Sequence, residues 1–162
     1  MIRIRGLRKV FPPDKLALAG VDLDIAAGEF VMIIGQSGAG KTTLLRCLNR
    51  LVEPTAGEVM LNGSQVTGAS SEGLRSARRQ IGIIFQQFNL VKRASVLENV
   101  LAGRLGHVPG LPSLVGRFPR RDRELALACL RQVGLEEFAS RRADTLSGGE
   151  QQRVAIARAL AQ

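Results

Sequence analysis

The chain has 162 residues, of which 45% are hydrophobic and 23% charged, an ordinary composition for one globular domain. No apolar run approaches the ~20 residues that a membrane-spanning helix needs, and Met1–Arg5 lacks the apolar core of a signal peptide. We therefore expect a cytosolic protein, or one held at a membrane by a partner. Cys47 and Cys129 are expected to be core residues rather than a disulfide or metal pair, and the lone His107 a surface residue.

The net charge of +9 comes mostly from arginine clusters at 75–79, 117–123 and 141–142. Nucleic acid is one possible partner for such a chain. The sequence has no Tyr or Trp, however, and its six Phe do not interleave with the clusters as a base-stacking surface would require. A solvated basic face, or one turned toward anionic lipid headgroups, explains the charge better.

The first half of the chain reads mainly as strands. Ile2 and Ile4 alternate with arginines and predict an edge strand, which Leu7–Phe11 continues. Further expected elements are strands at 16–25, 58–61 and, as buried strands, 30–34 and 81–85; helices at 41–51 and 74–79; and a tight turn at Asn62-Gly63.

The second half reads as helices. Ser95 and Glu98 form a capping-box pattern that begins a helix to about Ala102, and 103–119 reads as an irregular loop. A helix over 120–133 is expected to bury Leu125, Ala128, Cys129 and Val133, and one over 148–161 to bury Val154, Ile156, Ala157 and Leu160. No Gly, Asn or Pro follows this last pattern, which indicates a longer protein cut at this point.

One stretch carries clear chemistry. Gly35–Thr43 has the pattern G-x-x-x-x-G-K-T between an apolar run and a helical pattern, the context of a phosphate-binding loop. Its glycines allow backbone N–H groups to surround a phosphate, and the following helix directs its positive dipole end at the same anion. Lys41 would reach the β and γ phosphates, and the Thr42 hydroxyl would bind Mg²⁺.

A second helix start is also suited to an anion. Ser147 is a favourable N-cap for the last helix, and Gly148 and Gly149 leave the backbone N–H groups uncovered. An ordinary capped helix after a flexible joint explains this loop equally well when it is considered alone.

Taken together, these motifs resemble the ATP-binding subunit of ABC transporters. Gly35–Thr42 resembles the Walker A motif, Leu146–Glu150 the LSGGQ signature with Glu150 in place of Gln, and Ile84–Gln87 the Q-loop. Phe11 matches the position of the aromatic residue that stacks on adenine. Within the family, 91–106 and 113–123 are most similar to the phosphonate importer ATPase.

The resemblance implies an α/β P-loop NTPase fold: an ABC ATPase core with an antiparallel β part and a helical subdomain. Residues 1–162 would be one partial domain, divided into a nucleotide-binding part (1–85), a helical part (86–146) and the signature helix (147–162). The implied ligands are ATP and Mg²⁺, with Lys41 and Gln86 catalytic and Thr42 and Gln86 at the metal. The implied nucleotide contacts are Phe11, Gly35, Gln36, Ser37, Gly38, Ala39, Gly40, Lys41, Thr42, Thr43, Ser147, Gly148 and Gly149.

The implied partners are a second ATP-binding subunit, packed head to tail, and transmembrane permease subunits at the cytoplasmic face of the inner membrane. In the family, a Walker B strand with an Asp and a Glu, and later a switch histidine, follow the signature helix. These 162 residues do not contain them, so we expect the C-terminal strands to be missing and Val31–Ile34 to be left exposed. An importer ATPase, a fragment that binds ATP without turnover and, less favoured, a nucleic-acid-associated ABC ATPase all remain open.

Overall fold

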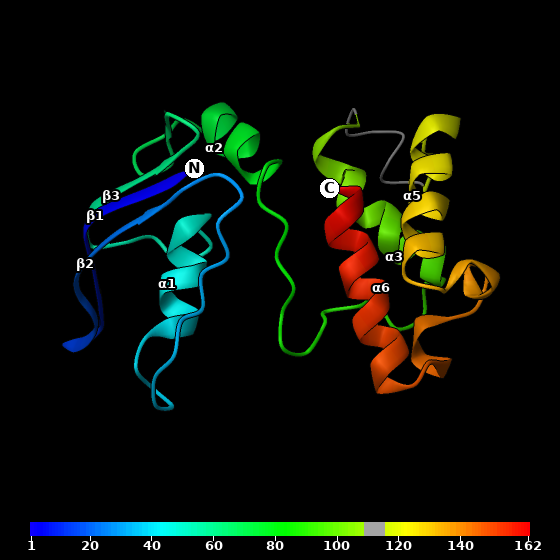
Figure 1. Cartoon of the computed structure of the whole chain (residues 1–162), viewed down its shortest axis with the longest axis horizontal. Coiled ribbons are helices and arrows are strands. Elements are labelled where there is room, and N and C mark those ends of the chain that lie inside the picture. The colour runs from blue at the N-terminus through cyan, green and yellow to red at the C-terminus, as the bar shows by residue number, and fades with distance from the viewer. Residues whose placement is uncertain (109–115) are drawn as a thin grey trace. The chain divides into compact units, whose positions relative to one another are not determined.

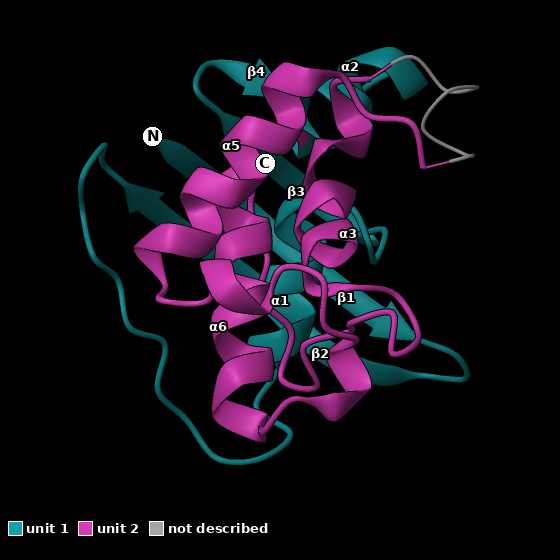
Figure 2. Ribbon diagram, turned by 90° about the vertical axis from the view of Figure 1, so that its right-hand side faces the viewer, with its two compact units in different colours: residues 1–78 teal, residues 79–162 magenta. Residues whose placement is uncertain are grey.

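The computed structural model describes residues 1–108 and 116–162 (Figure 1). The chain divides into two compact units, Met1–Arg78 and Arg79–Gln162, which Figure 2 draws in different colours. The predicted loop 103–119 lies partly outside the described residues. Its first part is instead a short 3-10 helix, η1 (Ala102–Gly106).

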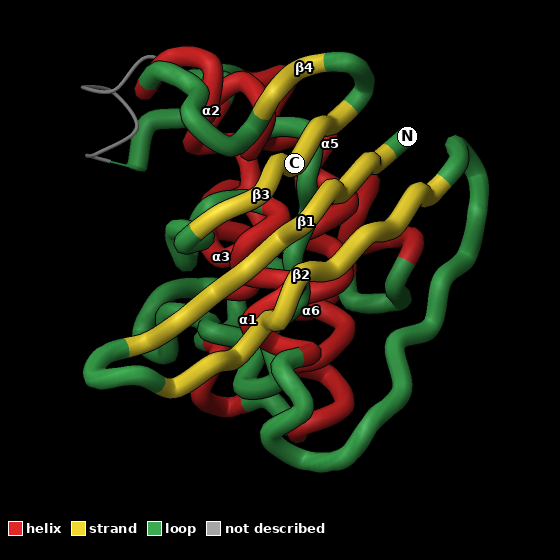
Figure 3. The backbone as a smooth tube through the Cα atoms, turned by 90° about the vertical axis from the view of Figure 1, so that its left-hand side faces the viewer, coloured by secondary structure: helices red, strands yellow, loops and turns green. Residues whose placement is uncertain are grey.

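The first unit contains an antiparallel sheet of four strands (Figure 3). Its members are β1 (Ile2–Phe11), β2 (Lys15–Ile25), β3 (Ala56–Leu61) and β4 (Ser64–Gln65), in the order β2-β1-β3-β4. The strand predicted at Ile2 forms, but it is not an edge strand, because β2 and β3 pair with its two sides. Asn62 and Gly63 both have positive φ, as a two-residue hairpin turn of type I′ requires, so the predicted turn is confirmed.

The apolar segments 30–34 and 81–85 are not strands, so both predictions of a buried strand are wrong. Phe30, Met32 and Ile34 are 85%, 66% and 84% exposed. A strand needs a neighbour to pair its N–H and C=O groups. Within the described residues, the sheet contains only β1–β4 and neither segment pairs with it, which leaves these residues without that neighbour.

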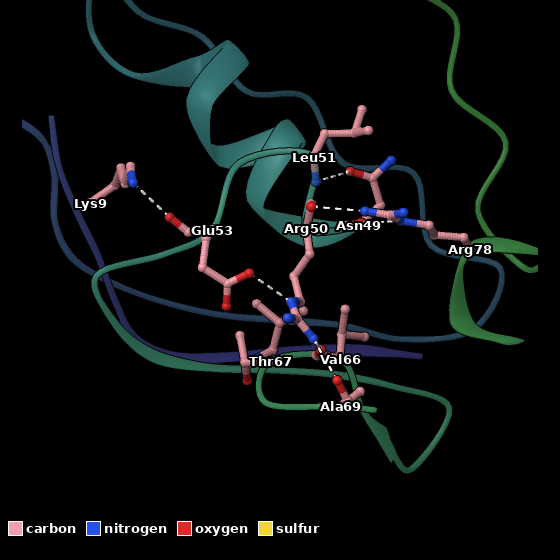
Figure 4. A network of polar contacts seen from close by, with 10 residues as sticks. Lys9, Asn49, Arg50, Leu51, Glu53, Val66, Thr67, Ala69 and Arg78 are labelled. Carbon is pink, nitrogen blue, oxygen red and sulfur yellow. Dashed lines mark hydrogen bonds and ion pairs between the residues drawn. The ribbon is translucent and has the colours of Figure 1, made fainter. Parts of the chain in front are cut away.

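Helix α1 (Lys41–Leu48) follows the phosphate loop and ends before the predicted Leu51. Its C-terminal end is held by arginines, as Figure 4 shows. Arg78, at the end of α2 (Ser71–Arg78), donates to the carbonyls of Asn49 and Arg50, both at 2.9 Å. Arg50 in turn donates to the carbonyls of Val66 and Ala69. Arg78 thus binds two carbonyls just beyond the last helical residue of α1, and Arg50 ties the same end of the helix to the chain after β4.

The second unit is helical. It contains α3 (Val96–Leu101), α5 (Arg120–Gln132), the 3-10 helices η2 (Glu136–Phe138) and η3 (Ala143–Thr145), and α6 (Gly148–Ala161). Its core is built from α3, α5 and α6, and the predicted capping box of Ser95 and Glu98 is present. No helix in the described part of the chain is both long and apolar enough to cross a bilayer.

The predicted buried faces of α5 and α6 are only partly right. Val154 and Ala157 are fully buried and Cys129 nearly so, but Leu125 is 38% and Leu160 54% exposed. On α5 the buried residues that were not predicted are Ala126, Leu130 and Asp122, whereas on α6 they are both alanines, Ala155 and Ala161. Because small side chains let helix backbones approach closely, the contact face of α6 follows its alanines rather than its largest apolar residues.

Candidate nucleotide-binding site

The phosphate loop owes its backbone path to two glycines. Gly38 has φ 85° and Gly40, the N-cap of α1, has φ 88°, both in the left-handed region that other residues avoid. Gly40 also abuts strand β2, since a Cβ at this position would lie 2.4 Å from the Ala17 carbonyl oxygen. Thus Gly40 is required both by the backbone conformation and by the close approach of β2.

The side chain of Lys41 folds back onto the start of the loop. Its Nζ donates to the carbonyls of Gly35 and Gln36 at 2.6 and 2.7 Å. Residues 35–39 and Thr42 are exposed, and the first turn of α1 carries no acidic residue. The ammonium and the positive end of α1 therefore meet at one exposed loop, which is the arrangement an anion binds.

Phe11 is located at the end of β1, opposite Lys15 of β2. The ring is half-buried, and the Lys9 ammonium lies 4.9 Å from its centroid. Ala17, two positions beyond Lys15, is the residue that abuts Gly40. Phe11 pairs with Lys15, and Ala17 is two residues, or about 7 Å, further along β2. The end of the hairpin that carries Phe11 therefore lies close to the phosphate loop.

Gln86 begins an exposed turn over 86–89 in the second unit. Phe88 and Asn89 have φ of 58° and 47°, left-handed values for residues that are not glycine. The guanidinium of Arg158 on α6 donates to the carbonyls of both, at 2.6 and 2.8 Å. The sequence offers no signal for this contact, because its partners are separated by 69 residues.

The signature-like loop begins α6 with a capping box. Ser147 Oγ accepts from the Glu150 N–H, and a Glu150 carboxylate oxygen accepts from the Ser147 N–H and hydroxyl at 2.7 and 2.8 Å. The hydrogen bond from the Ser147 hydroxyl, followed by that from its N–H, holds the pKa of Glu150 below its usual range. The predicted N-cap is confirmed, while the role of Glu150 in the cap was not foreseen.

Gly148 and Gly149 face open space. A Cβ added at either position would meet no heavy atom within 4 Å. Their conformation and packing within this chain therefore do not require glycine. A ligand or another chain that approaches this helix start closely would require it.

The other candidate groups are two cysteines and one histidine. Cys47 and Cys129 are buried and free, and burial raises the pKa of both thiols, in agreement with the core role expected for them. His107 is exposed, and its Nε2 lies 2.6 Å from the Gln162 carbonyl oxygen. Across 1–108 and 116–162, no three His, Cys, Asp or Glu side chains gather as a metal cage would require.

Comparison with known proteins shows the family. The sequence profile described as ABC transporter matches residues 18–162, and the chain belongs to this family. The fold agrees, since a dimeric bacterial ABC transporter cassette matches with a TM-score of 0.85 at 40% identity, over 99% of this chain and 69% of that one. A post-hydrolysis ATP-binding cassette bound to ADP and Pi matches with a TM-score of 0.81 at 39% identity, over the same shares. The predicted ABC ATPase fold is confirmed.

Among individual relatives, the phosphonates import ATP-binding protein PhnC of Bacillus cereus is 55% identical over all 162 residues. The corresponding protein PhnC 2 of Halalkalibacterium halodurans is 50% identical over the same residues. The chain spans 63% of the length of the first and 66% of the second. The chain is therefore similar to phosphonate importer ATPases, as the motifs predicted.

Proposed function

We propose that this chain is the nucleotide-binding part of the ATP-binding subunit of an ABC importer of the phosphonate type. The observation that carries the proposal is the phosphate loop, in which two left-handed glycines, the Lys41 ammonium and the start of α1 meet. Its identity of 55% to a phosphonates import ATP-binding protein favours ATP as the ligand and import as the process.

In this function, Gly35–Thr43 surround the phosphates and the Phe11 ring stacks on the adenine. Lys41 exchanges its bonds to the carbonyls of Gly35 and Gln36 for bonds to the β and γ phosphates. The exposed Thr42 hydroxyl fits Mg²⁺, which proteins commonly hold through one or two side chains together with substrate phosphates and water. Such an ion would supply charge neutralisation at the phosphates, and Gln86 would position the attacking water beside it.

The assembly we propose is a head-to-tail pair of subunits at the cytoplasmic face of the inner membrane, in contact with permease subunits. Ser147, Gly148 and Gly149 then contact the γ-phosphate of the nucleotide held by the partner. The open space around both glycines supports this contact, as does the dimeric form of a similar cassette. The division into 1–85, 86–146 and 147–162 belongs to the same proposal.

Replacing Lys41 tests nucleotide binding. Titration of the chain with a fluorescent ATP analogue and Mg²⁺ should show Lys41→Ala weakening affinity at least about tenfold, because a hydrogen bond from a charged group is worth ~1.5–3 kcal/mol. Lys92→Ala, which removes another exposed lysine, is the matched control and should bind as the unmodified chain does. Equal affinity of all three chains would contradict the proposal.

A chain that binds ATP without turning it over is the second candidate. It is favoured by Glu150, because hydrogen bonds from the Ser147 hydroxyl and N–H lower the pKa of its carboxylate and so make it a weaker base. Phosphate release at saturating ATP separates the two candidates. Release that Lys41→Ala abolishes supports the ATPase, and binding with no release above background supports the fragment.

A further inference from the structure

Arg158 connects two parts of the proposed site that are distant in sequence. It lies on α6 about three turns beyond Ser147. Its Nη1 donates to the Asn89 carbonyl at 2.8 Å and its Nη2 to the Phe88 carbonyl at 2.6 Å. Both carbonyls belong to the turn that Gln86 begins. One side chain therefore joins the helix of the signature-like loop to the turn of Gln86.

The turn depends on this support. Phe88 and Asn89 both have positive φ, which side chains other than glycine disfavour. Within the turn, the Phe88 N–H donates to the Phe85 carbonyl and the Asn89 N–H to the Gln87 carbonyl. The carbonyls of Phe88 and Asn89 accept from Arg158, so the guanidinium adds two charge-assisted bonds where the backbone is least favourable.

Arg158 is itself well anchored. Its side chain is partly buried, and burial lowers the pKa of the guanidinium, which stays charged at any ordinary pH. Its backbone carbonyl lies 2.4 Å from the position that a Cβ on Gly103 would occupy. Only a residue without a side chain fits there, so η1 packs directly on α6 at this level. The planar fork of arginine can reach both carbonyls at once, which the single ammonium of lysine does less well.

We propose that Arg158 is a positioning residue that fixes the Gln86–Asn89 turn to α6, so that Gln86 and the signature-like loop move as one body. The inference rests on the proposed function, in which Gln86 lies near the metal of the bound nucleotide. Loss of Arg158 would then let Gln86 leave its place without any change in the phosphate loop, which is part of the other unit.

The test compares ATP affinity with Mg²⁺ and with EDTA, using the full 162-residue chain. Mg²⁺ raises the ATP affinity of the unmodified chain by some factor over that in EDTA. In Gln86→Ala this factor should be about three- to tenfold smaller, the value of one hydrogen bond. Arg158→Met should reduce the gain from Mg²⁺ by the same factor and leave the ATP affinity in EDTA unchanged. The double variant should lose no more than either single variant, because both remove one interaction. Arg120→Met, at a side chain 93% exposed on α5, is the matched control and should change neither value.

Two outcomes would overturn the inference. In one, Arg158→Met weakens ATP binding by the same factor in Mg²⁺ and in EDTA, as a general loss of structure would. In the other, its effect adds to that of Gln86→Ala. If Arg158→Met fails to fold by circular dichroism, Arg158→Lys decides in the same assay, with an intermediate loss expected and no loss contradicting the role. If Lys41→Ala leaves ATP binding unchanged, the proposed function fails, which is distinguishable from an effect limited to Arg158.

Discussion

Gly40 meets two independent requirements, a left-handed backbone and a close approach to the Ala17 carbonyl. Glu150 likewise acts locally, through the N–H and hydroxyl of Ser147. At the scale of single residues, the candidate site is therefore shaped by a few contacts whose removal can be measured separately.

Gly40→Ala should destabilise the chain more than Gly38→Ala. Both residues have φ near 85–88°, so each alanine should cost ~1–2 kcal/mol for the left-handed conformation. A Cβ at position 38 meets no atom within 4 Å, whereas at position 40 it meets backbone at 2.4 Å. The difference in unfolding free energy, measured in denaturant, isolates this steric contact. Equal costs would show that β2 moves away freely.

Glu150→Gln should lower stability at neutral pH and not in acid. The pKa of Glu150 is lowered in the folded chain, first by the Ser147 hydroxyl and then by its N–H. A lowered folded pKa means that the charge stabilises the fold above the unfolded value of about 4.3 and that this contribution is lost as pH falls through the folded pKa. Melting temperatures of the two chains should therefore differ at pH 7, and the difference should shrink as the pH falls below the unfolded pKa. Glu137→Gln, at another exposed glutamate, is the control, and a difference that does not shrink on acidification would contradict the assignment.

At the scale of elements, the apolar segment 30–34 lies outside the sheet with most of its side chains exposed. Phe30, Met32 and Ile34 are all more than 60% exposed, and the segment has no strand beside it among the described elements. Exposed apolar chain with unpaired backbone groups favours association.

We expect the chain to associate as its concentration rises, and Met32→Lys to reduce this association, because a charge on such a segment opposes pairing. Sedimentation velocity over a range of concentrations measures the effect. Leu51→Lys, at a residue 50% exposed outside this segment, is the control and should associate as the unmodified chain does. A chain that stays monomeric throughout would rule out the expected role of the segment.

At the scale of the whole molecule, the chain consists of two compact units that meet in sequence at Arg78 and Arg79. Helix α2 ends at Arg78, and 81–85 has no regular structure. Each unit has its own buried residues, around Ile4 and Leu7 in the first and in the α3, α5 and α6 core in the second.

Limited trypsin digestion should therefore cut first near Arg79, since irregular segments between compact units are preferred cleavage sites. Mass spectrometry should find two fragments close to 1–79 and 80–162. Arg79→Gln should slow this first cut, while Arg131→Gln, on a helix of the second unit, should not. Early cleavage inside α5 or β1 would contradict the division.

Several features could be predicted from sequence because their causes are local. The capping boxes at Ser95 and Ser147 depend on residues three positions apart, and the Asn62-Gly63 turn on two adjacent residues. The phosphate-binding role of Gly35–Thr43 was likewise inferred from local spacing, that of Gly35, Gly40 and Lys41, and stays a prediction. The position of β1 inside the sheet and the exposure of Leu160 were missed, because both depend on which distant elements become neighbours.

The sequence by itself determined the start and bounds of α6 and the resemblance to ABC ATPases, and it predicted a phosphate-binding role for Gly35–Thr43, since each is encoded in short, contiguous motifs. Only the tertiary structure decided that 30–34 and 81–85 are not strands and that Arg158 holds the turn after Gln86. The physical reason is the same in both cases. Strand pairing and long-range hydrogen bonds need a partner from elsewhere in the chain, and the presence or absence of that partner cannot be read from the local pattern.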